Sequence, residues 1–285
     1  MAVLEQIVAV SLRTWCRGFI TRENLVVYEV FSDLNQIIAT EMTTAQELAV
    51  DIPARLRDNS TVGAGLSSWV VELDAVAKCF FSEDARLTEI AVYDRLINLG
   101  SSQKRIMRFY GLLEKAVVLQ HARNGTVRQY LARSSRQQNS QTILRWAEQA
   151  AEAVQVLHAR QIFHCDISCN NFFLDENLNV VIGDFGGASI DGSEGQSWYE
   201  LRSSLPLEAT ASVKTEIFAL GSAFYEISTK EVPFRDLGDH VVEALYANGQ
   251  FPDVRTLMLG TIISKCWERA YHSVDEVLVD IYNRE

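Results

Sequence analysis

The chain has 285 residues, of which 48% are hydrophobic and 22% are charged. These proportions are typical of a folded globular chain and argue against a disordered protein. The 26 basic and 37 acidic side chains give a formal net charge of −11. An acidic surface repels a phosphate backbone, so the composition argues against a nucleic-acid partner.

Apolar runs and cysteines bear on the cellular compartment. No run reaches the roughly 18 apolar residues that cross a bilayer, so we expect no membrane partner. Residues 1–19 are apolar but contain Glu5 and no basic leader, and we interpret them as a helix of the fold rather than a signal peptide. The five cysteines are odd in number. Reduced thiols in a cytoplasmic or nuclear protein explain them most simply.

The first part of the chain reads as a mixture of helix and strand. Residues 1–50 carry no motif that we can interpret, and we expect an N-terminal extension of unknown role. Two β-rich runs, 67–73 and 75–81, meet at Asp74, which predicts a tight hairpin there.

Further along, Leu87, Ile90, Leu96 and Ile97 recur at helical spacing within residues 82–100, which predicts a helix with these side chains on its apolar face. Two more strand-like runs follow it.

After Asn124, helical periodicity takes over. One apolar helix face is predicted within residues 142–160, made of Ile143, Ala147, Ala150, Val154 and Leu157. Strands first and helices afterwards, joined near residue 122, predict an α+β fold of two lobes. We place a small β-rich lobe at 51–122 and a larger helical lobe at 123–285.

The stretch that begins at His164 is the most informative about chemistry. Asp166 and Asn171 lie on a loop after an apolar helix, where both side chains can point into one cleft. Asp184 follows a short apolar strand, residues 179–183, that returns the chain to the same place. Phosphoryl transfer needs oxygen ligands for Mg²⁺ and a group facing the attacking hydroxyl. These residues therefore fit a phosphotransfer site.

Residues 164–171, HCDISCNN, resemble the H-R-D-x-x-x-x-N catalytic loop of protein kinases, and the Asp-Phe-Gly that begins at Asp184 resembles their D-F-G metal loop. By this resemblance Asp166 is the catalytic base, Asn171 a metal ligand and Asp184 the main metal ligand. The resemblance covers roughly residues 60–285. Within the kinases, the chain looks most like small, divergent kinases of fungal type. It implies the bilobal protein-kinase fold, with ATP and Mg²⁺ as cofactors.

Upstream, Gly63, Gly65 and Ser68 fall in a segment that resembles the kinase glycine-rich loop, G-x-G-x-x-G-x-V. Glycines there allow the backbone to approach the phosphates of ATP closely. Ser68 replaces the third glycine, so backbone contact at that position is expected to be weaker.

Lys78 stands in the middle of an apolar strand, where a lysine must be paired or reach solvent. The resemblance implies that it binds the α and β phosphates of ATP and pairs with a glutamate of the following helix. Glu89 is the expected partner, and Glu72 and Glu83 are the alternatives.

The resemblance also implies an adenine site, although residues of these types more often belong to an ordinary hydrophobic core and rank below the polar residues of the site. The expected contacts are Val70, Val76 and Phe173 around the adenine, Leu119 as the gatekeeper, and Gln120, His121 and Ala122 as the hinge.

Downstream, residues 205–208 occupy the position of the kinase A-P-E sequence and close an activation segment. Residues 216–226 resemble D-x-x-x-x-G-x-x-x-x-E and are apolar nearly all round, which predicts a central buried helix. Glu216 replaces the usual aspartate of that helix, and its extra methylene could shift the catalytic loop.

Two further departures lie within the catalytic loop. Cys165 replaces the arginine of H-R-D, and Ser168 replaces the lysine that steadies the transferred phosphate. Cys165 and Cys169 lack a second pair of ligands, so we interpret them as packing residues rather than a zinc site.

The resemblance implies a protein kinase that transfers the γ-phosphate of ATP to a hydroxyl of a protein substrate, with serine or threonine favoured. One alternative is a pseudokinase that acts as a nucleotide-binding scaffold. Another is a small-molecule phosphotransferase, which shares H-x-D-x-x-x-x-N and a metal aspartate. The sequence does not indicate the oligomeric state.

Overall fold

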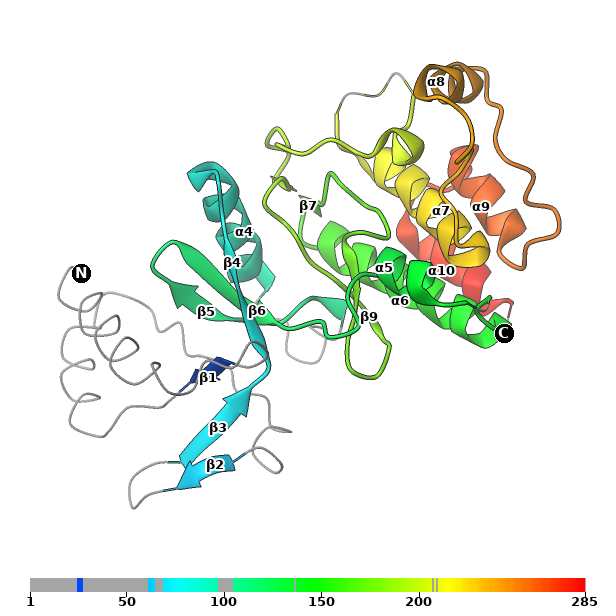
Figure 1. The fold of residues 1–285 in the computed structure, drawn as a ribbon. Helices are drawn as coiled ribbons and strands as arrows, with labels where there is room; N and C mark the ends of the chain where they lie inside the picture. The colour runs from blue at the N-terminus through cyan, green and yellow to red at the C-terminus, as the bar shows by residue number, and fades with distance from the viewer. Residues whose placement is uncertain are drawn as a thin grey trace. The chain divides into compact units, whose positions relative to one another are not determined.

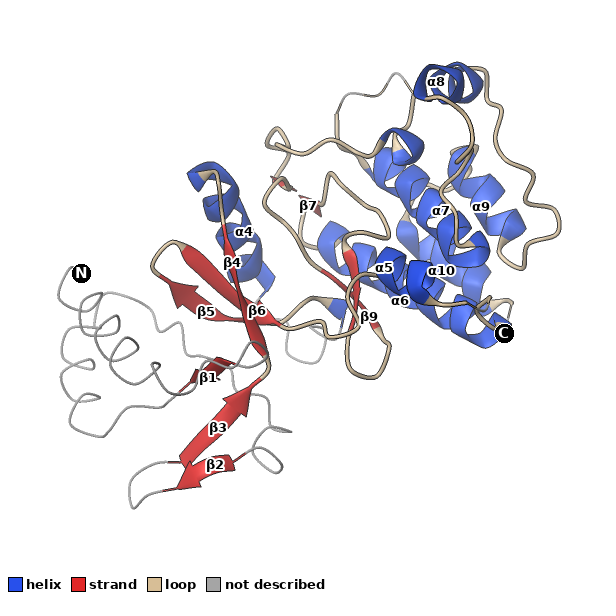
Figure 2. Ribbon diagram, in the orientation of Figure 1, coloured by secondary structure: helices blue, strands red, loops and turns tan. Residues whose placement is uncertain are grey.

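The computed structural model of the chain describes residues 25–27, 61–64, 69–96, 105–135, 137–206, 208 and 210–284, with side chains from residue 74 onward. The chain divides into two compact units. Unit 1 comprises Met1–Phe80 and Arg108–His121, and unit 2 comprises Phe81–Met107 and Ala122–Glu285. The described helices belong to unit 2 and most strands to unit 1 (Figures 1 and 2), which confirms the α+β class.

Unit 1 contains two antiparallel sheets, with strand orders β1-β3-β2 and β4-β6-β5. The strands are β1 (Leu25–Val27), β2 (Thr61–Ala64), β3 (Trp69–Leu73), β4 (Ala75–Cys79), β5 (Phe109–Leu113) and β6 (Ala116–Gln120). In the second sheet Ala75, Tyr110 and Val118 form a buried cluster, and Leu113 packs against it. β5 and β6 confirm the strands expected after the first helix.

The tight hairpin predicted at Asp74 is wrong. β3 and β4 flank Asp74 but pair in different sheets. Tight hairpins usually need a loop of about two residues, and a single residue does not supply it. Asp74 instead contacts His121 at the end of β6. The His121 N–H donates to the Asp74 carbonyl over 3.1 Å, and the imidazole Nδ1 lies 3.1 Å from the carboxylate.

Helix α4 (Glu83–Leu96) confirms the helix predicted after the first strands, and Leu96 is buried as expected, but the predicted apolar face is wrong at Leu87. Ile97 lies outside the described residues. Leu87 is 51% exposed. The buried residues are Glu89, Val92, Tyr93 and Leu96, which lie at the i, i+3, i+4, i+7 spacing of one helix stripe. A carboxylate occupies the first position of that stripe, so a search for apolar side chains alone does not find the face.

Unit 2 is built around the predicted central helix, α7 (Val213–Thr229), which is buried on nearly every side and packs against α6 and α9. Its helices after α4 are α5 (Val127–Arg133), α6 (Ser140–His158), α7, α8 (Asp239–Ala247), α9 (Gly260–Trp267) and α10 (Val274–Tyr282). The face predicted on α6 is buried as expected. Within the described ranges, none of the helices has the length and apolar character to cross a bilayer.

Two short strand pairs position the loops of unit 2. β7 (Ile162–Phe163) pairs with β10 (Ser189–Ile190), and β8 (Phe172–Leu174) pairs with β9 (Val180–Ile182). β9 confirms the strand predicted before Asp184. A 3-10 helix covers Leu201–Ser203.

Gly221 marks a close approach of α7 to α9. A Cβ added there would lie 2.6 Å from the Cβ of Cys266, which is nearer than side chains pack. Alanine favours a helix over glycine by about 1 kcal/mol, whereas overpacking a core costs about 1–3 kcal/mol. The net of these two effects is a decrease in the free energy of unfolding of up to about 2 kcal/mol for Gly221→Ala, which denaturant titrations would measure. Equal or greater stability would mean that α7 and α9 can separate at this contact.

Candidate active site

The catalytic loop, residues 164–171, connects β7 to β8 in unit 2 and brings Asn171 onto Asp166. The amide nitrogen of Asn171 donates to the backbone carbonyl of Asp166 over 2.7 Å and to its Oδ2 over 2.9 Å. This pair of hydrogen bonds fixes the orientation of the Asp166 carboxylate. Because the nitrogen of Asn171 is engaged, its amide oxygen is the atom that can ligate a metal.

The environment of Asp166 raises the pKa of its carboxyl group. Burial raises the pKa of Asp166 above its ordinary value, and the carboxylates of Glu200 and Asp184 raise it further. The hydrogen bond from Asn171 and the nearby His164 oppose this increase in the pKa. A carboxylate with a raised pKa is a better proton acceptor, which suits a general base.

Asp184 is held next to the catalytic loop by backbone contacts. The Gly183 N–H donates to the Asn171 carbonyl over 3.1 Å, and the Gly183 carbonyl lies 3.0 Å from His164 Nε2. Asp184 has a left-handed φ of 67°, which aspartate tolerates better than most residues. Asp184 is exposed, whereas Phe185 is fully buried and contacts the rings of His164 and Tyr93.

Glu216 of α7 holds the catalytic loop through a hydrogen bond to its backbone. Its side chain is fully buried and accepts three hydrogen bonds. The donors are the Cys165 N–H at 2.9 Å and the Tyr199 hydroxyl at 3.1 Å, both to Oε1, and His158 Nε2 at 3.0 Å to Oε2. Cys165 adopts a left-handed φ of 66°. Glutamate at this position therefore holds the loop backbone despite its extra methylene.

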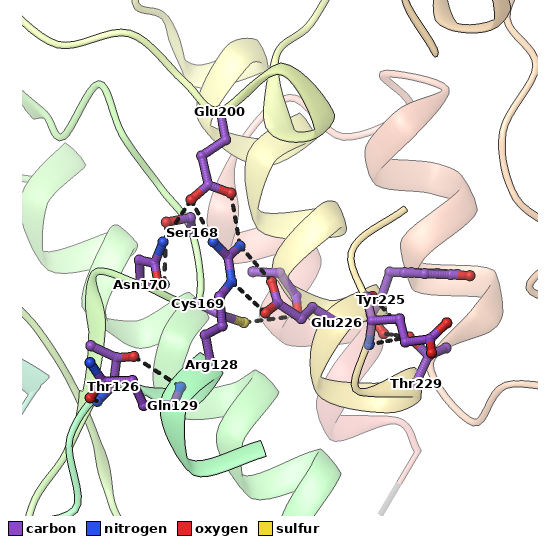
Figure 3. Close-up of polar contacts among 12 residues, drawn as sticks. Thr126, Arg128, Gln129, Ser168, Cys169, Asn170, Glu200, Tyr225, Glu226 and Thr229 are labelled. Carbon is purple, nitrogen blue, oxygen red and sulfur yellow. Dashed lines mark hydrogen bonds and ion pairs between the residues drawn. The ribbon is translucent and has the colours of Figure 1, made fainter. Parts of the chain in front are cut away.

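A second network joins α5, α7 and the activation segment, residues 184–208 (Figure 3). Arg128 donates to both oxygens of Glu226 over 2.6 and 2.8 Å and to both oxygens of Glu200 over 2.6 and 2.8 Å. Asn170 of the catalytic loop also donates to Glu200, over 2.8 Å. Charged, bidentate hydrogen bonds of this kind are among the strongest in proteins. The network fixes the activation segment beside the catalytic loop.

Sequence reasoning missed Arg128 and Glu200 as members of the site. Neither residue belongs to a motif, and they are 72 positions apart. Arg202, the basic residue of the activation segment, is engaged elsewhere: it donates to Asp239 over 2.8 Å and to the Leu237 carbonyl over 2.7 Å.

The substituted residues of the catalytic loop are buried. Ser168 is 1% exposed, and its hydroxyl accepts from the Asn170 N–H over 3.3 Å. The thiol of Cys165 lies 3.4 Å from the Phe163 carbonyl, and that of Cys169 lies 3.6 Å from the Ala223 carbonyl. Both thiols behave as the expected packing residues. Burial, with the Glu216 carboxylate nearby, raises the pKa of Cys165 to about 12, so the thiol stays protonated.

Helix α4 also contributes to the site region of unit 2. Glu89 is fully buried, and a Cβ added to Gly186 of the metal loop would lie 3.7 Å from its Oε2. At the other end of α4, Arg95 donates to the two carboxylate oxygens of Asp191 over 2.7 and 2.5 Å. Glu83, an alternative partner for Lys78, forms an ion pair with Arg86.

The expected nucleotide-binding residues are distributed over both units. In unit 1, the Lys78 ammonium lies 5.0 Å from the centre of the Phe80 ring, Leu119 and Gln120 are buried, and Val76 is 39% exposed. Ala122 and Phe173 belong to unit 2 and are half-buried. The pairing of Lys78 with Glu89 stays a prediction.

The glycine-rich segment is described only in part. Gly63 lies in β2 and Val70 in β3, where only the backbone is described. Gly65 and Ser68 lie outside the described residues, as does nearly all of the expected extension over 1–50.

The donor set of the site fits a divalent metal bound together with a nucleotide. Among the residues with described side chains, no group of three or more acidic, histidine or cysteine side chains could hold a metal alone. Mg²⁺ in phosphotransfer sites uses one or two carboxylates and takes its remaining ligands from water and substrate phosphates. Asp184 and the amide oxygen of Asn171, on adjacent loops, are oxygen donors of that kind.

Comparison with known proteins identifies the family. Residues 87–273 match the family described as protein tyrosine and serine/threonine kinase. The chain belongs to this family. The match confirms the kinase superfamily and, with the two units and mixed α+β elements, the protein-kinase-like fold. The glycine-rich segment and Lys78 precede the matched residues, and no finding bears on the expected likeness to fungal kinases.

Several serine/threonine kinases are similar to the chain at low identity. It is 31% identical over 125 residues to the RAF proto-oncogene serine/threonine-protein kinase of Xenopus laevis, which covers 39% of this chain and 20% of the relative. It is 27% identical over 178 residues to serine/threonine-protein kinase A-Raf of Mus musculus, covering 56% of this chain and 29% of the relative. The mitogen-activated protein kinase kinase kinase zak-1 of Caenorhabditis elegans is 25% identical over 195 residues, 58% of this chain and 26% of the relative. The chain thus spans less than a third of these relatives.

The network of Figure 3 predicts a measurable effect on stability. The Glu226 side chain is 5% exposed, and Arg128→Met would leave it buried without this cation. Breaking a buried ion pair on one side costs about 3–5 kcal/mol. Because Arg128 is 27% exposed, we expect a loss of about 2–3 kcal/mol in the free energy of unfolding.

The matched control is Arg255→Met, which removes an ion pair to Asp253 from a side chain that is 87% exposed. Exposed pairs contribute little to stability, so no measurable change is expected in the same unfolding experiment. Equal effects of the two substitutions would contradict the structural role of Arg128.

Proposed function

We propose that the chain is an active protein kinase that transfers the γ-phosphate of ATP to a hydroxyl group of a protein substrate, with serine or threonine favoured. The observation that carries the proposal is the orientation of Asp166 by Asn171, with Asp184 close enough to raise the pKa of Asp166. A base facing the hydroxyl and two oxygen donors beside it are the groups that phosphoryl transfer requires of a protein.

Each residue has a proposed role. Asp166 orients the substrate hydroxyl and accepts its proton, and Asn171 and Asp184 hold Mg²⁺. The metal, when bound with ATP, would neutralise charge on the transferred phosphate. Lys78, with Glu89 as its partner, is proposed to bind the α and β phosphates.

The remaining nucleotide contacts are also proposals. They are Gly63, Gly65 and Ser68 at the phosphates and Val70, Val76, Leu119, Gln120, Ala122 and Phe173 around the adenine. The division into an extension over 1–50 and lobes over 51–122 and 123–285 belongs to the same proposal, as does a cytoplasmic or nuclear location without nucleic-acid or membrane partners.

A pseudokinase is the second candidate, and one observation favours it. Ser168 stands where kinases have a lysine, is 1% exposed, and its hydroxyl is engaged by the Asn170 N–H. It cannot supply positive charge to the transferred phosphate. Nucleotide binding without phosphate transfer to any protein would support this candidate. A small-molecule phosphotransferase is less well supported, because the activation segment is retained and is held beside the catalytic loop by Glu200.

The separate roles of two aspartates give the first test of activity. We expect Asp166→Asn to lower kcat by at least about 100-fold, the usual contribution of a general base, and to leave ATP affinity unchanged. Asp184→Asn should weaken magnesium-dependent ATP binding and abolish transfer, because a neutral amide does not neutralise metal charge. Transfer of labelled phosphate and nucleotide titrations with and without Mg²⁺ measure these effects. The matched control is Asp253→Asn, which changes an exposed aspartate. Equal loss of ATP affinity in Asp166→Asn and Asp184→Asn would refute the assigned roles.

The activation segment should not need phosphorylation. Many kinases pair a phosphate of this segment with the arginine next to the catalytic aspartate, and Cys165 cannot serve as that cation. In this chain Arg128 already binds a carboxylate of the segment, Glu200, and Arg202 binds Asp239. We expect phosphatase treatment of purified protein to leave the transfer rate unchanged. A decrease of more than about tenfold, or roughly 1.4 kcal/mol of transition-state stabilisation, would show that a phosphate on the segment matters.

A further inference from the structure

Tyr199 connects the activation segment to Glu216, the buried carboxylate that holds the catalytic loop. Its hydroxyl donates to Glu216 Oε1 over 3.1 Å and lies 3.3 Å from the Thr215 hydroxyl, at the first turn of α7. Burial and the adjacent Glu216 carboxylate raise the pKa of Tyr199 well above its ordinary value, so the hydroxyl keeps its proton and remains a donor. The side chain of the preceding residue, Trp198, is 77% exposed and so differs from that of Tyr199.

The acceptor atom of Tyr199 is shared with the catalytic loop. Glu216 Oε1 also accepts the N–H of Cys165, the residue directly before Asp166. A buried carboxylate is strongly destabilising unless donors surround it. Removing the Tyr199 hydroxyl would therefore alter the hydrogen bonding of the same oxygen that positions the backbone next to the base.

The segment touches the catalytic loop at a second point close to the first. A Cβ added to Gly195 would lie 2.5 Å from Cys165 Sγ, so the backbone of the segment rests directly on this thiol. The Gly187 carbonyl accepts the N–H of Gln196 over 2.9 Å and closes the segment on itself. The segment therefore packs against Cys165, at the position where kinases usually have an arginine.

We propose that Tyr199 is a positioning residue, whose hydroxyl docks the activation segment on Glu216 and thereby holds Cys165 and Asp166 in the geometry for transfer. Its kinetic consequence rests on the proposed kinase function, whereas the docking itself does not. The device takes the place of an arginine that binds a phosphorylated segment, and it works without modification of the segment.

The test compares Tyr199→Phe with Tyr271→Phe in the full chain. Both substitutions keep the ring and remove a hydroxyl that donates to a carboxylate. Tyr271 donates to Asp280 of α10 over 2.6 Å, and its ring lies 5.5 Å from the ammonium of Lys265 in α9, outside the catalytic loop and the activation segment. Hydrogen–deuterium exchange of residues 184–208 and 163–171 is measured, together with kcat and KM for ATP. We expect Tyr199→Phe to speed exchange in both ranges and to lower kcat by about tenfold, the effect of one hydrogen bond to a charged group. KM for ATP should not change, and Tyr271→Phe should match the parent in all three measurements.

Each other outcome has a definite meaning. Unchanged exchange in Tyr199→Phe overturns the docking role. Faster exchange with an unchanged kcat in an active parent overturns the claim that docking positions the base, as does a rise in KM for ATP alone. A parent chain that transfers no phosphate refutes the proposed function, and the exchange measurement then still decides whether Tyr199 docks the segment.

Discussion

The arrangement of unit 2 depends on the burial of one carboxylate, that of Glu216. Removing a carboxylate from water costs several kcal/mol unless donors replace the lost hydration. The donors of Glu216 come from three separate segments: His158 at the end of α6, Cys165 in the catalytic loop and Tyr199 in the activation segment. Their positions are therefore linked, because a displaced segment would leave the buried charge with one donor fewer. The central helix α7 serves as the fixed reference for all three.

The parts of the site that the sequence predicts are those encoded at short range. Asp166 and Asn171 are five residues apart in one loop, and the strand before Asp184 brings that residue back because β8 and β9 form a local hairpin. The α6 face follows from its apolar period. Arg128 and Glu200 were not predictable in this way, because their pairing depends on how α5, α7 and the activation segment pack. Ion pairs across such separations leave no periodic signal in one sequence.

The two errors of the sequence-based prediction have physical causes of the same kind. Two β-rich runs flank Asp74 and suggest a hairpin, although only one residue separates them. The chain instead passes at Asp74 from one sheet to another. On α4, Leu87 is exposed and Glu89 is buried, the reverse of their hydropathy. In both places tertiary contacts outweigh local preference, as they commonly do in strands and at functional sites.

Two of the departures from the kinase pattern contact each other in the structure, because Glu216 accepts the N–H of Cys165. Gly195 of the activation segment lies against the Cys165 thiol, so closely that a Cβ added to Gly195 would lie 2.5 Å from Sγ. Arg128 supplies a cation that binds Glu200 of the activation segment, and Asn170 of the catalytic loop donates to the same carboxylate. We therefore interpret Cys165 and Glu216 as parts of a different way of holding the activation segment, rather than as independent losses of catalytic residues. Ser168 differs from them, because the described contacts of the loop include no cation that replaces the lysine.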